Sequence, residues 1–347
     1  MKRPIGIFLF LIFILMSCSI SPSTSMATAD DLLTPDIYLS TVTSTPSPTI
    51  EPVLVSERQK IRLIMEGYGV VEESQLNDEY WERLASQVSK YGEAKRILTL
   101  EYHGDNYNMY DGTYSMNPEE FESEMRYLLD NDYHFVTGPE LVGYLEGWLK
   151  LPTRSIILTT DSGGNSDESM PRMIALFGNL EAEYGVAPHM ISFIWTTSMD
   201  PELEIQCRDD ACWQTFREAI QSGYFTIGSH TETHRDFSTL TDVDTTWDLE
   251  TAAKTINSNL GINVYGISWP FEKCSTNPTL VSNMGYKFAF GGFSRDRYQL
   301  FTYSRDNEPL CLPRLFPPNR HGISGRPSGM TLAQMLDEMM NAFAPLE

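Results

Sequence analysis

Residues 224–235 read Tyr-Phe-Thr-Ile-Gly-Ser-His-Thr-Glu-Thr-His-Arg, an apolar, strand-like run that ends in two histidines. His230 and His234 lie four residues apart, and the whole chain has only 6 histidines. If this stretch were helical, both imidazoles would share one face and reach a single metal ion. The simpler interpretation is two solvated loop histidines, because a short motif also arises by chance. The surrounding segments decide between the two.

Strand-like and helix-like stretches alternate on both sides of this motif. The strand-like runs are 97–102, 155–160, 189–196, 224–228, 264–269, 287–290 and 312–316. The helix-like runs are 117–131, a segment opening at 137, 170–184, 213–221, 247–260, 278–284 and 332–343. Such alternation predicts a parallel sheet with both faces covered, in the α/β class. About seven strands predict a (β/α) barrel that is distorted or incomplete.

Residues 1–17 have the pattern of a lipoprotein signal peptide. Lys2 and Arg3 form a positive start, and residues 5–16 form an apolar run too short to span a membrane comfortably. Residues 15–18, Leu-Met-Ser-Cys, resemble a bacterial lipobox, which implies cleavage before Cys18 and a lipid anchor on its thiol. The alternative is plain secretion with an incidental cysteine. Residues 18–55 are rich in Ser, Thr and Pro, and we expect an extended tether there.

The remaining chain divides at a change of pattern. Residues 56–92 carry apolar residues at helical spacing and predict a small helical extension, and residues 93–347 are enough for one large domain. The formal net charge is -22, and removal of Lys2 and Arg3 makes it -24. Such acidity argues against nucleic acid as a partner. It suits a domain on the extracellular face of the cell membrane or a secreted one.

Four cysteines follow Cys18, and an even number in an exported chain permits two disulfides. The preferred pairing is Cys207–Cys212 with Cys274–Cys311. Four cysteines allow three connectivities, and the sequence alone does not choose among them.

Polar residues recur at the predicted C-terminal strand ends, where a barrel gathers its functional groups. These ends read Tyr102-His103-Gly104-Asp105, Thr160-Asp161-Ser162-Gly163, Trp195-Thr196, Ser229-His230, Ser268-Trp269-Pro270-Phe271 and Arg314-Leu315. An aspartate after a strand is often only a helix cap. Asp161 coincides with two histidines at a sister strand end, which favours a functional site.

From about Arg96 to Ala344 the chain resembles the polysaccharide deacetylases with a NodB homology domain, carbohydrate esterase family 4. Residues 159–163, Thr-Thr-Asp-Ser-Gly, stand where that family has Thr-Phe-Asp-Asp-Gly, and residues 228–234 match its Gly-Ser-His-Thr-x-x-His in full. Residues 269–272, Trp-Pro-Phe-Glu, stand for Tyr-Pro-Tyr-Gly. The pair at 102–103, the helix at Phe121 and residues 312–314 match in order.

The resemblance implies metal-dependent hydrolysis of acetyl groups on a cell wall, capsule or biofilm polysaccharide. Carried over to this chain, Asp161 is the general base, His230 and His234 are metal ligands, and Ser162 occupies the third ligand position. The implied cofactor is a divalent metal, with zinc the first choice. Such an ion polarises a carbonyl and acidifies water, and a nearby carboxylate removes the water's proton.

Ser162 departs from the family at the position where an aspartate completes the metal site. A neutral hydroxyl is a poor ligand for zinc, so two histidines alone would bind the ion weakly. Three interpretations are open. Asp161 moves onto the ion, a carboxylate such as Asp105 or Glu232 replaces the ligand, or the domain binds glycan without hydrolysis.

The remaining site residues have open roles. The family's late Leu-x-His general acid is absent, so His103 is the catalytic candidate and His321 a remote one. Trp269 and Phe271 are candidates for an aromatic wall against a sugar ring, with core packing as the alternative. Glu272 replaces a glycine and changes the local turn. Three functions follow: a polysaccharide deacetylase, a glycan-binding module, or a hydrolase of another acyl or amide substrate.

Overall fold

The structure is a computed structural model that describes residues 56–69, 71–102, 118–162, 166–196, 210–291, 302–303, 308–315 and 331–343. The expected signal peptide, the lipidated Cys18 and the tether lie outside these residues. His103, Asp105, Cys207 and His321 lie outside them as well. Within the described residues, none of the helices has both the length and the apolar character required to cross a membrane.

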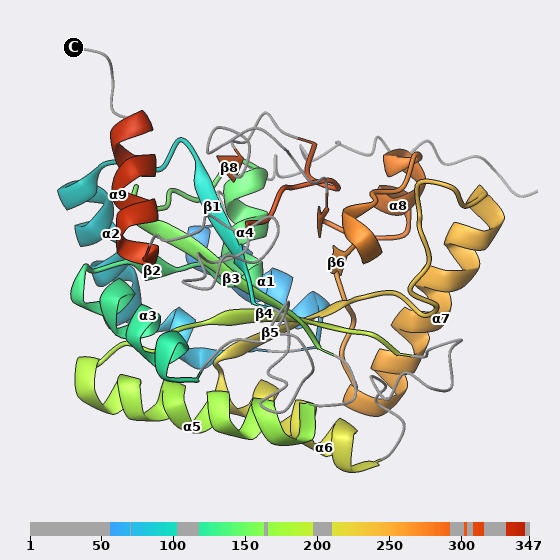
Figure 1. Cartoon of the computed structure of the whole chain (residues 1–347), viewed down its shortest axis with the longest axis horizontal. Coiled ribbons are helices and arrows are strands. Elements are labelled where there is room, and N and C mark those ends of the chain that lie inside the picture. The colour runs from blue at the N-terminus through green and yellow to red at the C-terminus, as the bar shows by residue number, and fades with distance from the viewer. Residues whose placement is uncertain are drawn as a thin grey trace, which may run out of the picture. The chain divides into compact units, whose positions relative to one another are not determined.

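Helices and strands alternate along the described chain, as the sequence predicts (Figure 1). The helices are α1 (Glu57–Gly67), α2 (Asp78–Tyr91), α3 (Pro118–Asp130), α4 (Gly138–Leu145), α5 (Ser166–Tyr184), α6 (Asp210–Ser222), α7 (Asp242–Leu260), α8 (Pro278–Asn283) and α9 (Leu332–Phe343), with short 3-10 helices η1 (Glu73–Leu76) and η2 (Pro270–Glu272). The strands are β1 (Ile97–Glu101), β2 (His134–Phe135), β3 (Ser155–Ser162), β4 (Met190–Ile194), β5 (Phe225–Ser229), β6 (Gly266–Ser268), β7 (Phe288–Phe290) and β8 (Thr302–Tyr303).

Local sequence rules set the helix ends. Ser56 opens α1 and Thr137 opens α4, and each forms a capping box with Gln59 or Glu140 at the third helical position. At the other end, α7 stops at Gly261, whose left-handed φ of 72° suits a residue without a side chain. These features confirm the helical character of residues 56–92 and the predicted start of the helix after Thr137.

The described strands form one sheet in the order β7-β6-β5-β4-β3-β1-β8, with β2 beside β3. Every strand pair is parallel except β1 with β8. Parallel strands joined through helices bring their C-terminal ends to one edge of the sheet. The arrangement is an incomplete, distorted (β/α) barrel with N-terminal helices, which confirms the predicted fold class.

Residues 308–315, here called the closing segment, span the gap between β7 and β1. Leu312 and Leu315 form isolated parallel bridges with β7 and β1 respectively. The sequence predicts a regular strand over residues 312–316, and that prediction is wrong for residues 312–315. Pro313 has no backbone N–H to donate between the two bridges, which interrupts a ladder.

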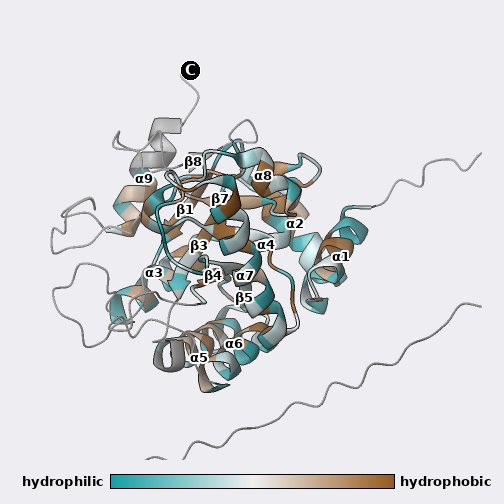
Figure 2. Cartoon of the chain, turned by 90° about the vertical axis from the view of Figure 1, so that its right-hand side faces the viewer, coloured by the Kyte–Doolittle hydropathy of each residue, from teal (hydrophilic) through white to brown (hydrophobic). Residues whose placement is uncertain are grey.

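Two hydrophobic cores lie on the two faces of the sheet, because successive strand residues point in opposite directions. Leu98 and Leu100 of β1 belong to the core shared with α3 and α5 to α9, whereas Ile97 belongs to the core shared with α1, α2 and α4. Figure 1 shows α5 and α6 side by side along one flank of the sheet and α7 along another. In Figure 2, coloured by hydropathy, the helices carry both hydrophilic and hydrophobic residues, as expected for a layer between core and water.

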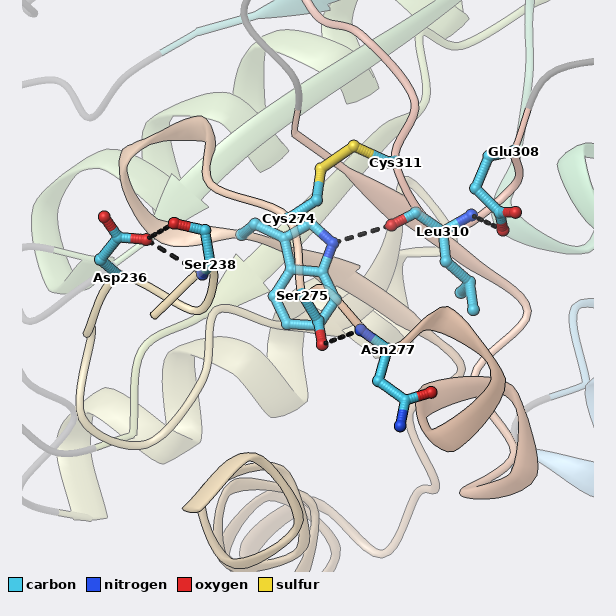
Figure 3. Close-up of a disulfide and its surroundings, with 9 residues drawn as sticks. Asp236, Ser238, Cys274, Ser275, Asn277, Glu308, Leu310 and Cys311 are labelled. Atoms are coloured by element: carbon cyan, nitrogen blue, oxygen red, sulfur yellow. Dashed lines mark hydrogen bonds between the residues drawn. A yellow bond between two sulfur atoms is a disulfide. The ribbon is translucent and has the colours of Figure 1, made fainter. Parts of the chain in front are cut away.

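A disulfide joins the turn after β6 to the closing segment (Figure 3). It links Cys274 to Cys311 and confirms one of the two predicted pairs. Leu310 lies beside it, and its carbonyl accepts a hydrogen bond from Trp269 Nε1 at 2.9 Å. Cys212 is disulfide-bonded too. The closing segment is therefore fixed by covalent and backbone contacts at the end of the barrel where the strands terminate.

Candidate active site

The parallel strands bring the predicted residues together at their C-terminal ends. Asp161 lies near the end of β3, in register with Phe193 of β4, and His230 follows β5 directly. Ser268 is the last residue of β6 and donates a hydrogen bond from Oγ to Asp161 Oδ2 at 2.9 Å. His230 Nε2 lies 3.8 Å from the same carboxylate oxygen. The motifs of β3 and β5 therefore form one site.

The imidazole of His230 is oriented by a backbone carbonyl. Its Nδ1 lies 2.9 Å from the carbonyl oxygen of Ser268, and a carbonyl only accepts, so Nδ1 carries the proton. In the neutral imidazole the lone pair that a metal ion would take is then on Nε2. Such an outer hydrogen bond is the usual way in which a protein fixes a metal-binding histidine.

His234 is brought to His230 by a loop, because residues 230–234 are not helical. Thr231 and His234 both have left-handed backbones, with φ of 73° and 51°. The His234 N–H donates to Thr231 Oγ1 at 3.1 Å, which closes the turn. The two imidazole centroids lie 4.8 Å apart at 69°. The four-residue spacing therefore pairs the histidines through a tight turn and not through a helix face.

Asp248 of α7 accepts hydrogen bonds from this loop. It is fully buried, and its carboxylate accepts hydrogen bonds from the backbone N–H groups of Glu232 at 2.7 Å and Thr233 at 3.2 Å. The Thr233 hydroxyl donates to it as well. A buried carboxylate with these partners is stabilised and holds the loop rigidly.

Two aromatic rings contact His234. Trp195 stacks on the imidazole at 4.4 Å, and Phe271 meets it edge-on at 4.8 Å. Phe271 is 63% exposed although it is a large apolar side chain. An exposed ring beside the site suits the predicted contact with a sugar ring.

Arg314 of the closing segment lies among three carboxylates. Its guanidinium donates to both Asp161 oxygens, at 2.8 and 2.9 Å, and to Glu272 Oε1 at 2.6 Å. Glu101, the last residue of β1, lies 2.7 Å from the same guanidinium. Arg314 and Glu101 are both only 1% exposed. A single cation therefore joins β1, β3, the turn after β6 and the closing segment.

Burial and charge shift the proton affinities of this cluster. Burial raises the pKa of Glu101 well above its ordinary value, although Arg314 acts in the opposite direction. Burial alone would lower the pKa of Arg314, but the charges of Asp161, Glu101 and Glu272 raise it further above its ordinary value. Arg314 is therefore a permanent cation next to Asp161.

The other predicted residues are placed as follows. Trp269 is 1% exposed and packs on Phe237 with ring centroids 5.0 Å apart. Its Nε1 donates a hydrogen bond to the Leu310 carbonyl. This environment favours the packing role of Trp269 over contact with a sugar. Ser162 ends β3 in register with Ile194 of β4. His103 lies outside the described residues, so its catalytic role stays a prediction.

The implied metal ion would be held by His230 and His234. Imidazole nitrogens suit zinc, and the fixed tautomer of His230 suits that role. Within the described parts of the chain, no group of three or more His, Cys, Asp or Glu side chains is arranged to hold a metal. Glu232 accepts a hydrogen bond from the Thr196 hydroxyl at 2.5 Å, and Asp161 is engaged by Arg314. The described side chains therefore fit two ligands and supply no third. The Ser162 side chain lies outside them, so its role as a ligand stays a prediction.

Comparisons with known proteins agree with this geometry. Residues 150–289 match the sequence model of a family described as polysaccharide deacetylase. No curated protein sequence matches the chain.

Solved structures share the fold. A polysaccharide deacetylase from Bacillus cereus aligns with a TM-score of 0.52 and 19% identity, over 72% of this chain and 70% of that chain. The deacetylase PplD from Streptococcus pyogenes, in complex with acetate, gives 0.53 and 17%, over 70% of this chain and 98% of that chain. IcaB from Ammonifex degensii gives 0.50 and 17%, over 65% and 94%. At these identities the similarity shows the fold, and residues 150–289 match the polysaccharide deacetylase model, as the motifs at 159–163 and 228–234 predict.

Proposed function

We propose that this protein is an exported, lipid-anchored, metal-dependent deacetylase that removes acetyl groups from an N-acetylated cell-surface polysaccharide. The observation that carries the proposal is Asp161, held by Arg314 at 2.8 Å and facing His230 Nε2 at 3.8 Å. This geometry joins a fixed carboxylate to an oriented imidazole. The family match over residues 150–289 supports the reaction class.

In the proposed reaction Asp161 takes a proton from the water that attacks the acetyl carbonyl. Because Arg314 and Ser268 already hold its two oxygens, Asp161 needs little reorganisation as the base. The same bonds argue for the base role over a ligand role. A divalent ion bound by His230 and His234 would supply Lewis acidity to the carbonyl and the water. The leaving amine takes a proton from a general acid, for which His103 is the candidate.

Acetate release tests this proposal. The purified protein is incubated with chitooligosaccharide, peptidoglycan or poly-N-acetylglucosamine in the presence of zinc, cobalt or chelator. We expect metal-dependent acetate release, reduced at least about 100-fold in Asp161→Asn. The absence of release from every substrate, with metal supplied, counts against the proposal.

The membrane anchor is tested separately, because it rests on residues 1–55 alone. We expect the wild-type protein in the membrane fraction of a bacterial host and Cys18→Ala in the periplasm or medium. Retention of Cys18→Ala in the membrane argues against lipidation at Cys18.

A second candidate function is glycan binding without hydrolysis. It is favoured by Ser162 at a ligand position and by the lack of a third metal ligand among the described residues. Under this alternative, glycan binding persists in chelator and in His230→Ala, and acetate release stays at background. Binding that both treatments abolish argues against the metal-free module.

A further inference from the structure

The turn after β6 contains two successive residues with left-handed backbones. Phe271 has φ 57° and Glu272 has φ 56°. Residues with side chains avoid this region, because Cβ crowds the backbone there. The resembled family has glycine at the second of these positions, which adopts the conformation without strain. In this chain the strained conformation is kept, and something else must hold it.

The Glu272 side chain supplies that support. Its Oε1 accepts a hydrogen bond from Arg314 Nη2 at 2.6 Å, and the two side chains are 15% and 1% exposed. A charge-assisted hydrogen bond to a buried guanidinium is among the stronger side-chain contacts. The backbone contributes weaker contacts, from Glu272 N–H to the Trp269 carbonyl at 3.2 Å.

The turn sets the position of the preceding ring. Phe271 is 63% exposed but meets the His234 imidazole edge-on at 4.8 Å. An exposed phenyl ring on an unsupported turn would sample several positions. Strained backbone held by surrounding contacts is a recurring feature of ligand-binding sites.

We propose that Glu272 is a positioning residue that holds Phe271 against His234 through its contact with Arg314. In this position Phe271 would contact the apolar face of the pyranose that carries the reacting acetyl group. This contact rests on the proposed function. Arg314 also holds Asp161, so the same cation contacts both the residue that positions Phe271 and the proposed general base. A glycine at position 272 has no side chain and cannot make this connection.

The position of Phe271 can be read from His234 without any substrate. In full-length, chelator-treated protein labelled with ¹³C-histidine, the ring current of Phe271 displaces the His234 C–H signals. His234→Gln assigns those signals. Phe271→Ala gives the shift that results when the ring is removed. Glu272→Gly removes the carboxylate and the strain, and Glu272→Gln removes only the charge.

We expect Glu272→Gly to reproduce roughly half or more of the Phe271→Ala shift, and Glu272→Gln a smaller shift in the same direction. Glu250→Gln is the control, because Glu250 is exposed and pairs with Lys254 on α7. If both Glu272 variants keep the wild-type His234 signals while Phe271→Ala moves them, the positioning role is wrong. If Phe271→Ala moves nothing, the ring does not lie beside His234, and the proposal is also overturned.

Glycan assays on the same variants separate this inference from the proposed function. We expect Glu272→Gly to raise KM about 3-fold to 10-fold, and to add little to the effect of Phe271→Ala in the double variant. Fully additive effects show that Glu272 does not act through Phe271. If the wild type neither binds nor hydrolyses acetylated glycan while the His234 signals shift as expected, the proposed function fails and the positioning role stands.

Discussion

At the residue scale, Arg314 gives the sharpest expectation. It is buried among Asp161, Glu101 and Glu272, so its removal leaves three carboxylates without their shared cation. We expect Arg314→Met to lower the free energy of unfolding by about 3 kcal/mol, measured by urea denaturation. Arg62→Met is the control, since Arg62 pairs with exposed carboxylates and should change stability by about 0.5 kcal/mol or less. Equal stability of the two variants would contradict the role of Arg314.

Ser162 stands where the resembled family has an aspartate as metal ligand. An aspartate at this position adds a charged oxygen ligand to the two imidazoles. We expect Ser162→Asp to raise zinc affinity about 10-fold or more, measured by competition with a fluorescent chelator. Ser162→Asn provides the neutral control of similar size. A wild-type affinity already equal to that of Ser162→Asp means that another residue completes the site.

The residues of the site were predictable from the sequence where they belong to local motifs. Asp161 lies near the end of a strand, and His230 and His234 follow another, each in a short, ordered pattern. The structure brings them together. Glu101 and Glu272 were not predicted as site residues. Their contact with Arg314 joins segments more than forty residues apart, and no local pattern encodes such a contact. The sequence places Arg314 at the end of a predicted late strand, but it does not indicate the partners of Arg314.

At the element scale, α7 controls the histidine loop through Asp248. Its carboxylate holds two N–H groups and one hydroxyl of residues 232–233. Asp248→Ala leaves those buried donors without a partner. We expect a loss of about 2 kcal/mol in stability and a fall of about 10-fold or more in zinc affinity. Asp236→Ala is the control within the same loop, because Asp236 caps only Ser238. A stability loss with unchanged zinc affinity would limit Asp248 to a structural role.

Elements with strong periodicity or caps were predicted well, and short ones were not. The two-residue strands β2 and β8 are too short to show alternation. Helix α7 begins at Asp242, earlier than predicted, because Thr241 caps it through Asp244 N–H. The closing segment has strand-like composition, yet its bridges depend on the distant partners β7 and β1. Pairing between such segments is a tertiary property that composition does not determine.

At the scale of the whole molecule, the N-terminal helices connect to the barrel through buried ionisable groups. The Tyr80 hydroxyl of α2 donates a hydrogen bond to the Glu140 carboxylate of α4. Glu140 Oε1 also lies 2.7 Å from Nε2 of His134 in β2, within hydrogen-bond distance. Burial, and then the charge of Glu140, raises the pKa of the nearby Glu72 to about 8 from 4.5. Because this pKa is raised, the contribution of Glu72 to the free energy of unfolding is fully present below pH 4.5 and is lost as pH rises through 8.

Replacing Glu72 with glutamine removes this loss. We expect Glu72→Gln to match the wild type near pH 4.5 and to be more stable at pH 9 by about 2 kcal/mol in urea denaturation. Glu79→Gln, at an exposed position of α2, should follow the wild type at both pH values. If Glu72→Gln also follows the wild type at pH 9, the Glu72 carboxyl is not held in its neutral form by the fold.

The acid side of the stability curve depends on His189 and Glu140. Burial lowers the pKa of His189 to about 4 from 6.5, so its contribution is present above pH 6.5 and is lost as pH falls through 4. His134 and Thr137 lower the pKa of Glu140 to about 2 against the effect of burial, so its contribution is lost as pH falls from 4.5 through 2. As pH falls from 6.5 to 4.5, the stability lost through His189 is offset by the stability gained through Glu72. We therefore expect a plateau of unfolding free energy there, with a fall on both sides. In Glu72→Gln the plateau should become a slope that rises to pH 6.5, and a flat curve in that variant would contradict the opposition of these two groups.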